Sequence, residues 1–379
     1  MKVLYIDPQS GNNLALYDYN LLKCIDADIT YCCSIIYDAP VVDNIRYKYV
    51  FTYNRLSNNF LKAFSYLGSL ILVLCIAIRT KPDIIHIQWW RLWILDYIFL
   101  AFFKKCCKTI VYTAHNLVPH ESGNSKDRQC QLYYRHVDKI IVHAEKTKYE
   151  LVERFEISKN KISVIPHGIL AKEVNPNRDK IIAELKRKYN LNGKIIISAI
   201  GQQSSYKGTD IILDAYRESI ILQNSKRFAF IIAGKGDIVK KEMSSSYSNL
   251  VIYDEFLPTE ILDAIYDISD IILLPYRIIS QSGVLLTAVA KEIPYIATDV
   301  GGLLEPLAIA PIAWRLNENS PKELSKLLES LENNPQEIIK KKCNPDGWKK
   351  VKNYYSWESI GSKTLECYNS SVYNNLNTV

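Results

Sequence analysis

The stretch IILLPYRIISQSGVLLTAVAKEIPYIATDVGGLLE, residues 271–305, decides the fold. It opens with Ile271–Leu274, a short apolar run typical of a strand that is buried on both faces. A polar loop then reaches Ser282–Gly283, where a helix should begin with free backbone N–H groups. Pro294–Thr298 predicts a second buried strand, and Gly301–Gly302 predicts a loop that passes close to a ligand. The stretch therefore predicts a strand–helix–strand unit of a parallel sheet.

The loop in this unit favours anion binding. A loop at the carboxyl end of a parallel strand that leads into a helix N-terminus is a ready anion site, and phosphate is the usual anion. An ordinary N-cap in a plain strand–helix–strand unit explains the same residues, so the alternative stays open at this point.

Two more predicted strands end in glycine. Ile195–Ile200 leads into Gly201 and then Lys207, and Phe228–Ala233 leads into the sequence GKGD at 234–237. Lys207 can reach a phosphate as a compact point charge, although most lysines are simply solvated at the surface. The carboxyl ends of parallel strands meet at one edge of a sheet. Three glycine-bearing ends in one half of the chain therefore favour a phosphate site there.

Composition narrows the class of protein. With 379 residues, 48% of them hydrophobic, two domains with proper cores are expected. The net charge of +7 favours anionic partners, such as nucleotide phosphates, lipid diphosphates or an acidic membrane face. No nucleic-acid motif is visible, so no nucleic-acid partner is expected. The nine cysteines form no CxxC pattern and indicate reduced thiols in the cytoplasm. The six scattered histidines argue against a metal cage, and no signal peptide is expected.

Two apolar stretches raise the question of membrane contact. Leu61–Ile78 is at the short end for a membrane span, and a predicted strand, Ile84–Gln88, follows at once. We therefore expect a buried helix there. Trp89–Lys108 is aromatic and apolar and ends in basic residues, which suits a membrane interface. An ordinary buried helix is the favoured alternative. The two interpretations are compatible if one side of this helix faces a lipid-bound acceptor.

In their order and spacing, these motifs resemble the donor-binding domain of family 4 glycosyltransferases. The resemblance rests on Tyr206-Lys207-Gly208, AGKGD at 233–237, SQSGV at 280–284 and PYIATDVGGLLE at 294–305. Stretches of the first half also resemble the family, namely MKVLYID at 1–7, the glycine loop at 11–13, PDIIHIQ at 82–88, TIVYTAHNLVPHE at 109–121, VDKIIVHAEKTKYEL at 137–151 and KISVIPHGI at 161–169. YSWESIGSKTLECY at 355–368 resembles the final family helix.

The resemblance covers nearly the whole chain and implies the GT-B fold, an α/β fold with two Rossmann-like domains facing each other across a cleft. It implies an acceptor-binding domain at 1–166, a nucleotide-sugar-binding domain at 167–350, and a helical segment at 351–379 that returns to the first domain.

The resemblance also assigns roles to residues. The transferase must stabilise a nucleotide diphosphate as it leaves, with fixed donors and cations. The expected donor-binding residues are Gly11, Gly201, Lys207, Phe256, Leu257, Arg277, Ser280, Gln281, Ser282, Gly283, Val284 and Glu305. Among these, Phe256 and Leu257 are expected at the base unless they are core residues, and Arg277 at the phosphates unless it faces water.

His115 and Lys207 are the expected catalytic residues. His115 follows the predicted strand Ile110–Thr113 and resembles a family histidine near the reacting sugar. There it can donate a hydrogen bond to a sugar hydroxyl or to the departing phosphate without acting as a base. The residues expected to line the acceptor pocket are Asn116, His120 and Glu121. Structural roles are expected for His86, His136, His143 and the hinge residue His167.

The chain departs from the family pattern at two places. Many members carry paired glutamates at the positions of Ser280 and Thr287, and an arginine at the position of Gln202. Ser280 and Gln281 would then hold the donor sugar as neutral partners, and Glu305 can supply a carboxylate. We expect retention of anomeric configuration by front-face attack, with no protein base and no metal.

The resemblance implies transfer of a sugar from a nucleotide-diphosphate sugar, UDP- or GDP-linked, to a hydroxyl of a lipid-linked saccharide. We expect this at the cytoplasmic face of the membrane, in peripheral contact with anionic lipid. The Ile-, Lys-, Asn- and Tyr-rich composition resembles that of proteins from AT-rich bacterial genomes. For a bacterial member, the family resemblance implies a role in surface polysaccharide (exopolysaccharide, capsule or O-antigen) synthesis. Two alternatives stay open, a catalytically degenerate GT-B subunit that serves a partner glycosyltransferase and a GT-B sugar-nucleotide epimerase.

Overall fold

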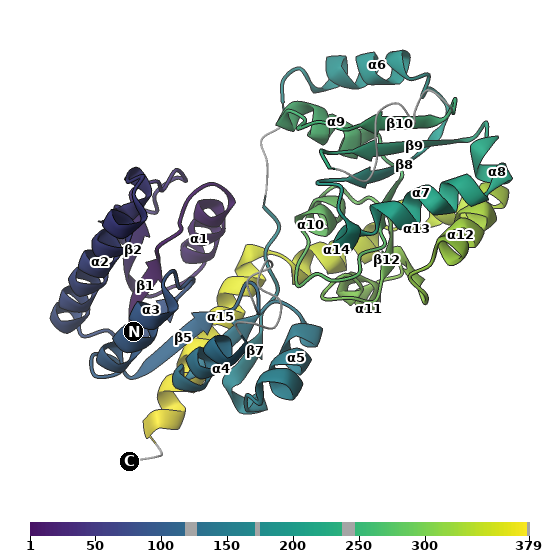
Figure 1. The fold of residues 1–379 in the computed structure, drawn as a ribbon. Helices are drawn as coiled ribbons and strands as arrows, with labels where there is room; N and C mark the ends of the chain where they lie inside the picture. Colours follow the sequence, from purple (N-terminus) through teal and green to yellow (C-terminus); the bar gives the residue numbers. More distant parts are fainter. Residues whose placement is uncertain (118–126, 171–174, 237–246, 377–379) are drawn as a thin grey trace. The chain divides into compact units, whose positions relative to one another are not determined.

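The computed structural model describes residues 1–117, 127–170, 175–236 and 247–376. The chain divides into two compact α/β units, one formed by Met1–Leu170 with Tyr355–Val379 and the other by Ala171–Tyr354 (Figure 1). The C-terminal segment of the chain therefore belongs to the first unit. Each unit contains one parallel sheet, as the predicted pair of Rossmann-like domains requires.

Seven parallel strands form the sheet of the first unit, in the order β3-β2-β1-β4-β5-β6-β7. Their bounds are β1 Lys2–Asp7, β2 Asp28–Ser34, β3 Arg46–Phe51, β4 Ile84–Ile87, β5 Thr109–Thr113, β6 Lys139–Val142 and β7 Ile162–Val164. Successive side chains of a strand point to opposite faces. In β1, Leu4 and Ile6 join one core cluster, while Val3 and Tyr5 join the other. Burial on both faces explains why these strands are nearly continuous apolar runs.

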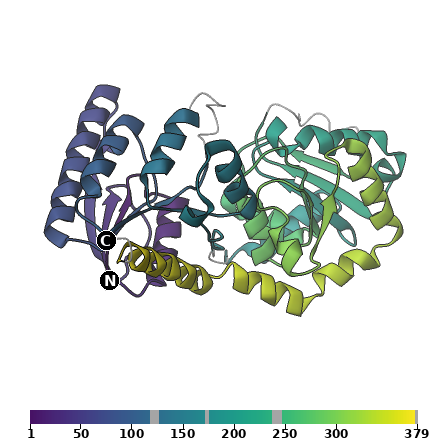
Figure 2. The same ribbon diagram turned by 90° about the horizontal axis from the view of Figure 1, so that it is seen from below.

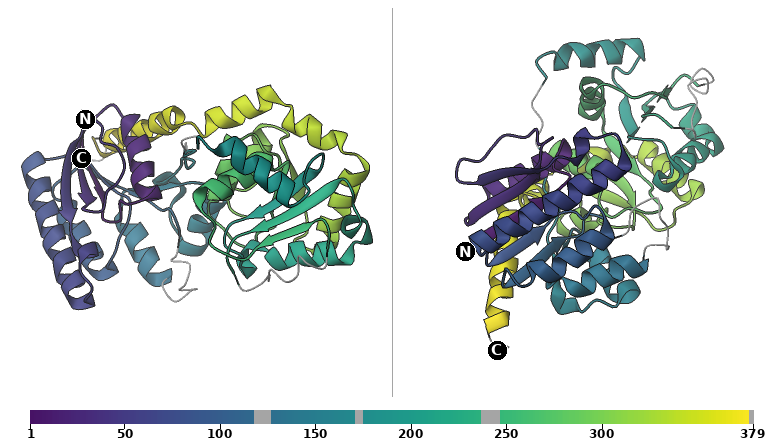
Figure 3. Two further views of the ribbon diagram at one scale, coloured as in Figure 1. Left: turned by 90° about the horizontal axis from the view of Figure 1, so that it is seen from above. Right: turned by 60° about the vertical axis from the view of Figure 1, so that its left-hand side comes forward.

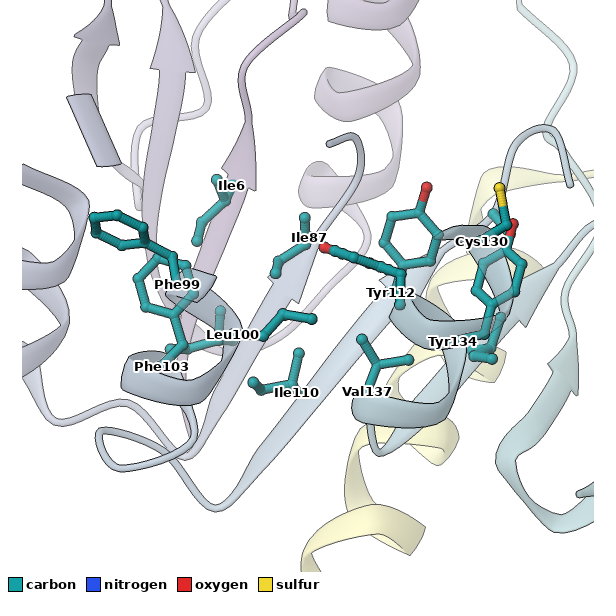
Figure 4. Packing of buried hydrophobic residues seen from close by; sticks show 14 of the residues in the cluster. Ile6, Ile87, Phe99, Leu100, Phe103, Ile110, Tyr112, Cys130, Tyr134 and Val137 are labelled. Atoms are coloured by element: carbon teal, nitrogen blue, oxygen red, sulfur yellow. The ribbon is translucent and has the colours of Figure 1, made fainter. Parts of the chain in front are cut away.

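Helices cover both faces of this sheet. On one face lie α1 (Asn13–Lys23) and α15 (Trp357–Leu376), which contact each other; Figure 2 shows α15 in yellow beside the purple α1. The other face is covered by α2 (Asn59–Thr80), α3 (Trp93–Phe103), α4 (Asp127–His136) and α5 (Glu145–Phe155). Figure 4 shows Leu100 of α3 beside the strand residues Ile87 and Ile110, and Phe99 and Phe103 belong to the same core cluster. The described part of the unit also contains two short 3-10 turns, Tyr53–Arg55 and Lys159–Lys161.

Six parallel strands form the sheet of the second unit, in the order β10-β9-β8-β11-β12-β13. Their bounds are β8 Ile195–Ile200, β9 Phe228–Ala233, β10 Leu250–Tyr253, β11 Ile271–Leu274, β12 Tyr295–Thr298 and β13 Ala313–Leu316. The helices are α6 Arg178–Lys188, α7 Thr209–Glu218, α8 Ile220–Gln223, α9 Thr259–Ile268, α10 Gly283–Ala290, α11 Glu305–Ile309, α12 Pro321–Asn333, α13 Gln336–Lys342 and α14 Pro345–Tyr354, with a 3-10 turn at Ser205–Lys207. The predicted strand–helix–strand unit is confirmed as β11, α10 and β12.

α2 differs from the buried helix that was expected at Leu61–Ile78. Only one side of α2 is buried, through Tyr66, Ser69, Leu70, Val73 and Ala77, while apolar residues on the opposite side face solvent. Among the described residues, α2 alone is long and apolar enough, by length and composition, to cross a membrane. The prediction of burial was therefore wrong for its outer side, because an apolar sequence does not tell which residues another element covers.

The buried side of α2 is bonded to its neighbours. The Tyr66 hydroxyl donates to Asp96 Oδ1 at 2.6 Å, and the Ser69 hydroxyl donates to the Val50 carbonyl at 2.7 Å. Asp96 Oδ2 in turn accepts the backbone N–H groups of Arg91 and Leu92 at 2.9 and 2.8 Å. Burial raises the pKa of Asp96 to about 6. These bonds fasten α2 to β3, to α3 and to the loop before α3.

Replacing Tyr66→Phe should lower the unfolding free energy of the first unit by about 1–3 kcal/mol, because a buried carboxylate oxygen loses its donor. Chemical denaturation followed by tryptophan fluorescence measures this. The control is Tyr97→Phe, since the Tyr97 hydroxyl makes only an exposed contact with His136, 3.1 Å from Nε2. Equal losses in the two variants would contradict the assignment of Tyr66 as a fastening residue.

Candidate active site

The carboxyl edge of the second sheet gathers the predicted donor residues. In the strand order, β8 and β11 are neighbours, with β9 beyond β8 and β12 beyond β11. The chain thus winds outward in both directions from the β8–β11 pair. Ligands of open α/β sheets bind outside the carboxyl ends of the strands at such a switch point. The loops that follow β8, β9, β11 and β12 all leave from this edge.

Glycines let these loops approach one another. Gly234 has φ 145°, and a Cβ there would lie 2.0 Å from the Gly201 carbonyl oxygen. Gly208 has φ 67°, and a Cβ there would lie 2.1 Å from the Pro275 carbonyl oxygen. Both positions exclude any other residue by backbone conformation and by space. The predicted convergence of glycine-bearing strand ends is confirmed.

Lys207 is held at this edge as a half-buried cation. A Cβ built on Gly201 would lie 2.8 Å from Lys207 Nζ, so the ammonium rests against the backbone of that glycine. The Tyr206 and Tyr276 rings flank it, with centroids 5.9 and 5.8 Å from Nζ. Burial lowers the pKa of Lys207. In the described part of the chain no carboxylate pairs with it, so the site holds a positive charge ready for an anion.

The N-terminus of α10 adds backbone donors. The Ser282 side chain caps the helix by accepting the Leu285 N–H at 3.3 Å. The first amides of a helix have no acceptor within it, so those of Gly283 and Val284 can meet an anion. Gly283 has open space where a Cβ would stand, and the Val284 side chain approaches Gly201. The helix N-terminus therefore lies beside the loop that carries Lys207.

Two buried polar atoms lie in the same loop. Gln203 Oε1 and Ser204 Oγ have no hydrogen-bond partner within the described residues, although Gln203 Nε2 donates to the Gly234 carbonyl at 2.6 Å. Gln203 and Lys207 line a small cavity of about 10 Å³. Buried polar atoms normally have partners, so this loop has unused capacity to bind a polar ligand. Neither residue was predicted as a site residue, because neither belongs to a recognisable motif.

Arg277 lies at the same edge but is engaged. Its guanidinium forms a bidentate ion pair with Asp210, with Nη1–Oδ1 at 2.8 Å and Nη2–Oδ2 at 2.5 Å. Its backbone N–H also donates to the Tyr206 carbonyl at 2.7 Å. Arg277 therefore joins the loop after β11 to the start of α7, and contact with a phosphate would require the ion pair to open.

Phe256 and Leu257 line a pocket at the end of β10. The pocket has a volume of about 310 Å³, and its other walls come from α6 and the start of α9, including Leu185 and Ile261. Phe256 is 83% exposed, so it is not a core residue. Lys235 Nζ lies 5.2 Å from the centre of its ring. The pocket presents an aromatic face of the kind that a planar base can cover.

The expected sugar-binding residues lie on the loops after β11 and β12. The Ser280 carbonyl accepts the Gly302 N–H at 3.3 Å, and a Cβ at Gly301 would lie 2.1 Å from the Ile279 carbonyl oxygen. Gly301 thus brings the two loops together, whereas the sequence suggested close approach to a ligand. Gln281 and Glu305 are half-buried there, and Glu305 begins α11. The Thr287 hydroxyl donates to the Gly283 carbonyl at 2.8 Å, within its own helix.

In the first unit, His115 belongs to a chain of hydrogen bonds at the ends of β4, β5 and β6. Its Nε2 lies 2.7 Å from the Gln88 side-chain oxygen, and its Nδ1 lies 3.1 Å from His143 Nε2. His143 Nδ1 lies 2.9 Å from the Ile165 carbonyl oxygen. The Trp89 ring stacks on His115 at 4.8 Å, and the Tyr17 ring meets its edge at 5.0 Å. Gln88 and His143 were not predicted as site residues.

The Ile165 carbonyl decides the proton positions in this chain. A carbonyl only accepts, so neutral His143 carries its proton on Nδ1 and accepts from His115 through Nε2. His115 then carries its proton on Nδ1 and donates it to His143 Nε2, while its Nε2 faces the Gln88 side-chain amide. Burial, with the neighbouring histidines, lowers the pKa of His115 well below its usual value, and burial lowers the pKa of His143 to about 3. His115 is therefore neutral, and both nitrogens that it would offer to a substrate are already engaged.

The other predicted residues of the first unit lie nearby or outside the described residues. Gly11 is buried in the loop before α1, where a Cβ would lie 2.9 Å from the Ile36 side chain. Asn116 is half-buried directly after His115. His120 and Glu121 lie outside the described residues. Across the described ranges, no group of three or more His, Cys, Asp or Glu side chains can hold a metal ion.

Comparison with known proteins identifies the glycosyltransferase family models that this chain matches. Residues 34–172 match the model of Glycosyltransferase Family 4, and residues 194–334 match that of Glycosyl transferases group 1. A D-inositol 3-phosphate glycosyltransferase of Corynebacterium aurimucosum is 23% identical over 278 residues, 68% of this chain and 65% of the relative. The phosphatidylinositol N-acetylglucosaminyltransferase GPI3 subunit of Saccharomyces cerevisiae is 24% identical over 266 residues, 68% of this chain and 57% of the relative. The chain thus spans less than two thirds of the length of these curated relatives.

Solved structures share the fold along the whole chain. A glycosyltransferase from Rickettsia africae has a TM-score of 0.67 at 17% identity and covers 98% of both chains. The Anabaena protein Alr3699/HepE, solved with UDP and glucose, has a TM-score of 0.67 at 15% identity and covers 98% of this chain and 100% of that one. Together with the two parallel sheets, these similarities show the GT-B fold.

Replacing Lys207→Met should leave the unfolding free energy of the second unit unchanged or raise it, since a desolvated charge is removed from a well-packed place. The same change should weaken binding of a nucleoside diphosphate by about tenfold or more, because the fixed cation is lost. Denaturant unfolding and calorimetric titration measure the two effects. Lys226→Ala, at an exposed lysine of the same unit, is the control. A destabilised variant with normal binding would identify Lys207 as a structural residue.

Replacing His143→Gln should reduce the acid sensitivity of the first unit. The folded unit keeps His143 neutral, whereas the unfolded chain takes up a proton as the pH falls through about 6.5, so acidification favours unfolding. Between about pH 7.5 and about pH 5, the unit with His143 should lose about 2 kcal/mol more unfolding free energy than the variant. Parallel losses in the two proteins would show that His143 is charged in the folded state.

Proposed function

We propose that this chain, whose two halves belong to glycosyltransferase families of the GT-B fold, transfers a sugar from a nucleotide-diphosphate sugar to a saccharide hydroxyl. The single observation that carries the proposal is the half-buried Lys207 ammonium, which has no carboxylate partner in the described chain and lies beside the N-terminus of α10. A fixed cation and free helix amides are what a departing diphosphate needs. The pocket at Phe256 and Leu257 supports a place for the base.

The reaction we propose retains the configuration at the anomeric carbon. The bond from this carbon to the diphosphate oxygen breaks as the acceptor oxygen attacks the same face, and the acceptor proton passes to the departing phosphate oxygen. Lys207 and the amides of Gly283 and Val284 stabilise the charge on the diphosphate. Because these groups stabilise the negative charge of the departing diphosphate, we propose that neither a metal nor another cofactor is needed.

The histidine chain of the first unit supports a mechanism without a protein base. His115 is neutral and bonded through both nitrogens, so its contribution is to hold the edge of the acceptor domain in one arrangement. To touch the substrate, His115 would exchange Gln88 for a sugar hydroxyl. Ser280, Gln281 and Glu305 are the groups that we propose bind the donor sugar.

The acceptor we propose is a lipid-linked saccharide at the cytoplasmic face of a bacterial membrane, in the synthesis of a surface polysaccharide. The net charge of +7 and the exposed apolar helices of the first unit support this choice. Among the relatives, one is named for D-inositol 3-phosphate and another for phosphatidylinositol, and the second name supports the choice of a lipid acceptor. We propose a UDP- or GDP-linked donor, and the Anabaena structure with UDP and glucose supports a nucleotide sugar.

A second candidate is a catalytically degenerate subunit that serves another glycosyltransferase. Thr287 favours it, since a residue bonded within its own helix stands where many family members carry a glutamate. The intact Lys207 site opposes it.

Thermal unfolding with UDP, GDP, ADP and their sugar conjugates tests the proposal, with a chelator present throughout. A ligand that binds only the folded state raises the melting temperature. We expect a clear rise with one nucleotide, a larger rise with one of its sugars, and loss of both in Lys207→Met. No rise with any of them at high concentration would favour the degenerate subunit.

A further inference from the structure

The outer side of α2 is an uninterrupted apolar stripe. The exposed residues at positions 60, 61, 64, 68, 71, 72, 75 and 78 recur on one side of the helix, and they are Phe60, Leu61, Phe64, Gly68, Ile71, Leu72, Cys75 and Ile78. Phe60 is 79% exposed and Phe64 69%. Between Lys62 and Arg79 the helix has no charged residue. The stripe extends over roughly 27 Å of helix, far more apolar surface in one place than scattered residues would give.

α3 continues the stripe. α2 and α3 contact each other and lie side by side in Figures 1 and 3. On α3, Ile94, Ile98 and Phe102 are exposed, by 56%, 47% and 46%. We call the α2 stripe together with these three residues the α2–α3 apolar face. Its aromatic and aliphatic side chains are exposed on two helices of the same unit that contact each other.

The packing of the inner side of α2 argues against a membrane span and leaves only the outer side free for contact with a membrane. α2 connects β3 to β4, and both strands belong to the same sheet. Its inner side is fastened by the bonds from Tyr66 to Asp96 and from Ser69 to Val50. A helix that is fastened in this way cannot leave the unit without breaking the fold. One apolar side with a packed opposite side is the pattern of an interfacial helix.

The charges around the face complement an anionic surface. In the described segment 52–108 the only acidic residues are Asp83 and Asp96. Asp96 is buried, and Asp83 pairs with Lys108 at 2.8 Å. Exposed basic residues flank the helices, namely Arg79, Lys81, Arg91, Lys104 and Lys105. Basic residues beside an apolar, aromatic face bind the surface of anionic lipids.

We propose that the α2–α3 apolar face inserts into the headgroup region of an anionic bilayer and holds the first unit on the membrane. A pocket of about 480 Å³ at the start of α3 shares Ile94 with this face and is also lined by Trp90, Arg91 and Trp93. The pocket has the size of a ligand site, so an acceptor anchored in the same bilayer would meet it at the membrane. This last step rests on the proposed function, whereas the membrane contact rests on the face alone.

Sedimentation of the full chain with lipid vesicles tests the proposal. We expect binding to vesicles of phosphatidylcholine with phosphatidylglycerol, and weaker binding to phosphatidylcholine alone, since part of the attraction is electrostatic. The double variant Phe64→Glu with Ile71→Glu should bind about tenfold more weakly or worse, because two charges enter the apolar face. Replacing Arg79→Gln with Lys105→Gln should reduce only the preference for the anionic vesicles.

The matched control is Ile220→Glu, at an isoleucine of the second unit that is 74% exposed. It should bind vesicles as the unaltered chain does. The altered positions are exposed, and circular dichroism checks that each variant is folded. Vesicle binding that survives the Phe64 and Ile71 changes overturns the proposal. So does a chain that binds no vesicles, or one that forms a dimer which those changes dissociate.

Nucleotide binding separates this proposal from the proposed function. The Phe64 and Ile71 variant should keep the rise in melting temperature with the nucleotide sugar, because the donor edge belongs to the second unit. Vesicle binding without any nucleotide effect would overturn the proposed function and leave the membrane face standing.

Discussion

The donor edge depends on one close contact of backbone with backbone. The chain after β9 lies against the Gly201 carbonyl, where a Cβ at residue 234 would come within 2.0 Å of the oxygen. Neighbouring strands are only about 4.8 Å apart, so loops that leave them meet only where side chains are absent. Gly208 allows the same approach to Pro275 on the other side of the switch point. Lys207 lies between these contacts, and its position follows from them.

The two units treat charge in opposite ways at their strand ends. In the second unit, burial leaves a cation without a carboxylate partner in the described chain, and helix amides lie beside it. In the first unit, burial makes the histidines neutral and their nitrogens bond to one another and to the backbone. A preorganised positive site suits charge that develops during reaction. A neutral, saturated chain suits a surface that positions a partner without exchanging protons.

The parts of the fold that were predictable are those that local sequence controls. Strands β8, β9, β11 and β12 could be predicted because buried parallel strands are apolar throughout. Glycines at 201, 208 and 234 could be predicted as turn residues, although the atoms they approach could not. The cap at Ser282 is where the polar loop indicated the start of a helix. In each case the information lies within a few residues.

The parts that were missed depend on residues far apart in the chain. Arg277 pairs with Asp210, 67 positions away, and no local pattern announces that partner. His143 was expected to be structural, yet it sets the proton position of His115, 28 positions away. The outer side of α2 was predicted to be buried because the apolar stretch is short for a membrane span and a strand follows it at once. Which side a neighbour covers is decided by the sheet, the buried Tyr66–Asp96 bond and α3.

Two exceptions to ordinary folding rules occur where we propose function. A half-buried ammonium and a buried side-chain oxygen without a described partner, Gln203 Oε1, occur in one loop. The uncovered apolar face occurs on a helix whose inner side is held to the unit by buried hydrogen bonds. Such features lower stability and are kept only where something offsets them. The well-packed sheets offset this loss of stability in the free protein. An anion bound at Lys207 and lipid bound on α2 would remove the loss itself.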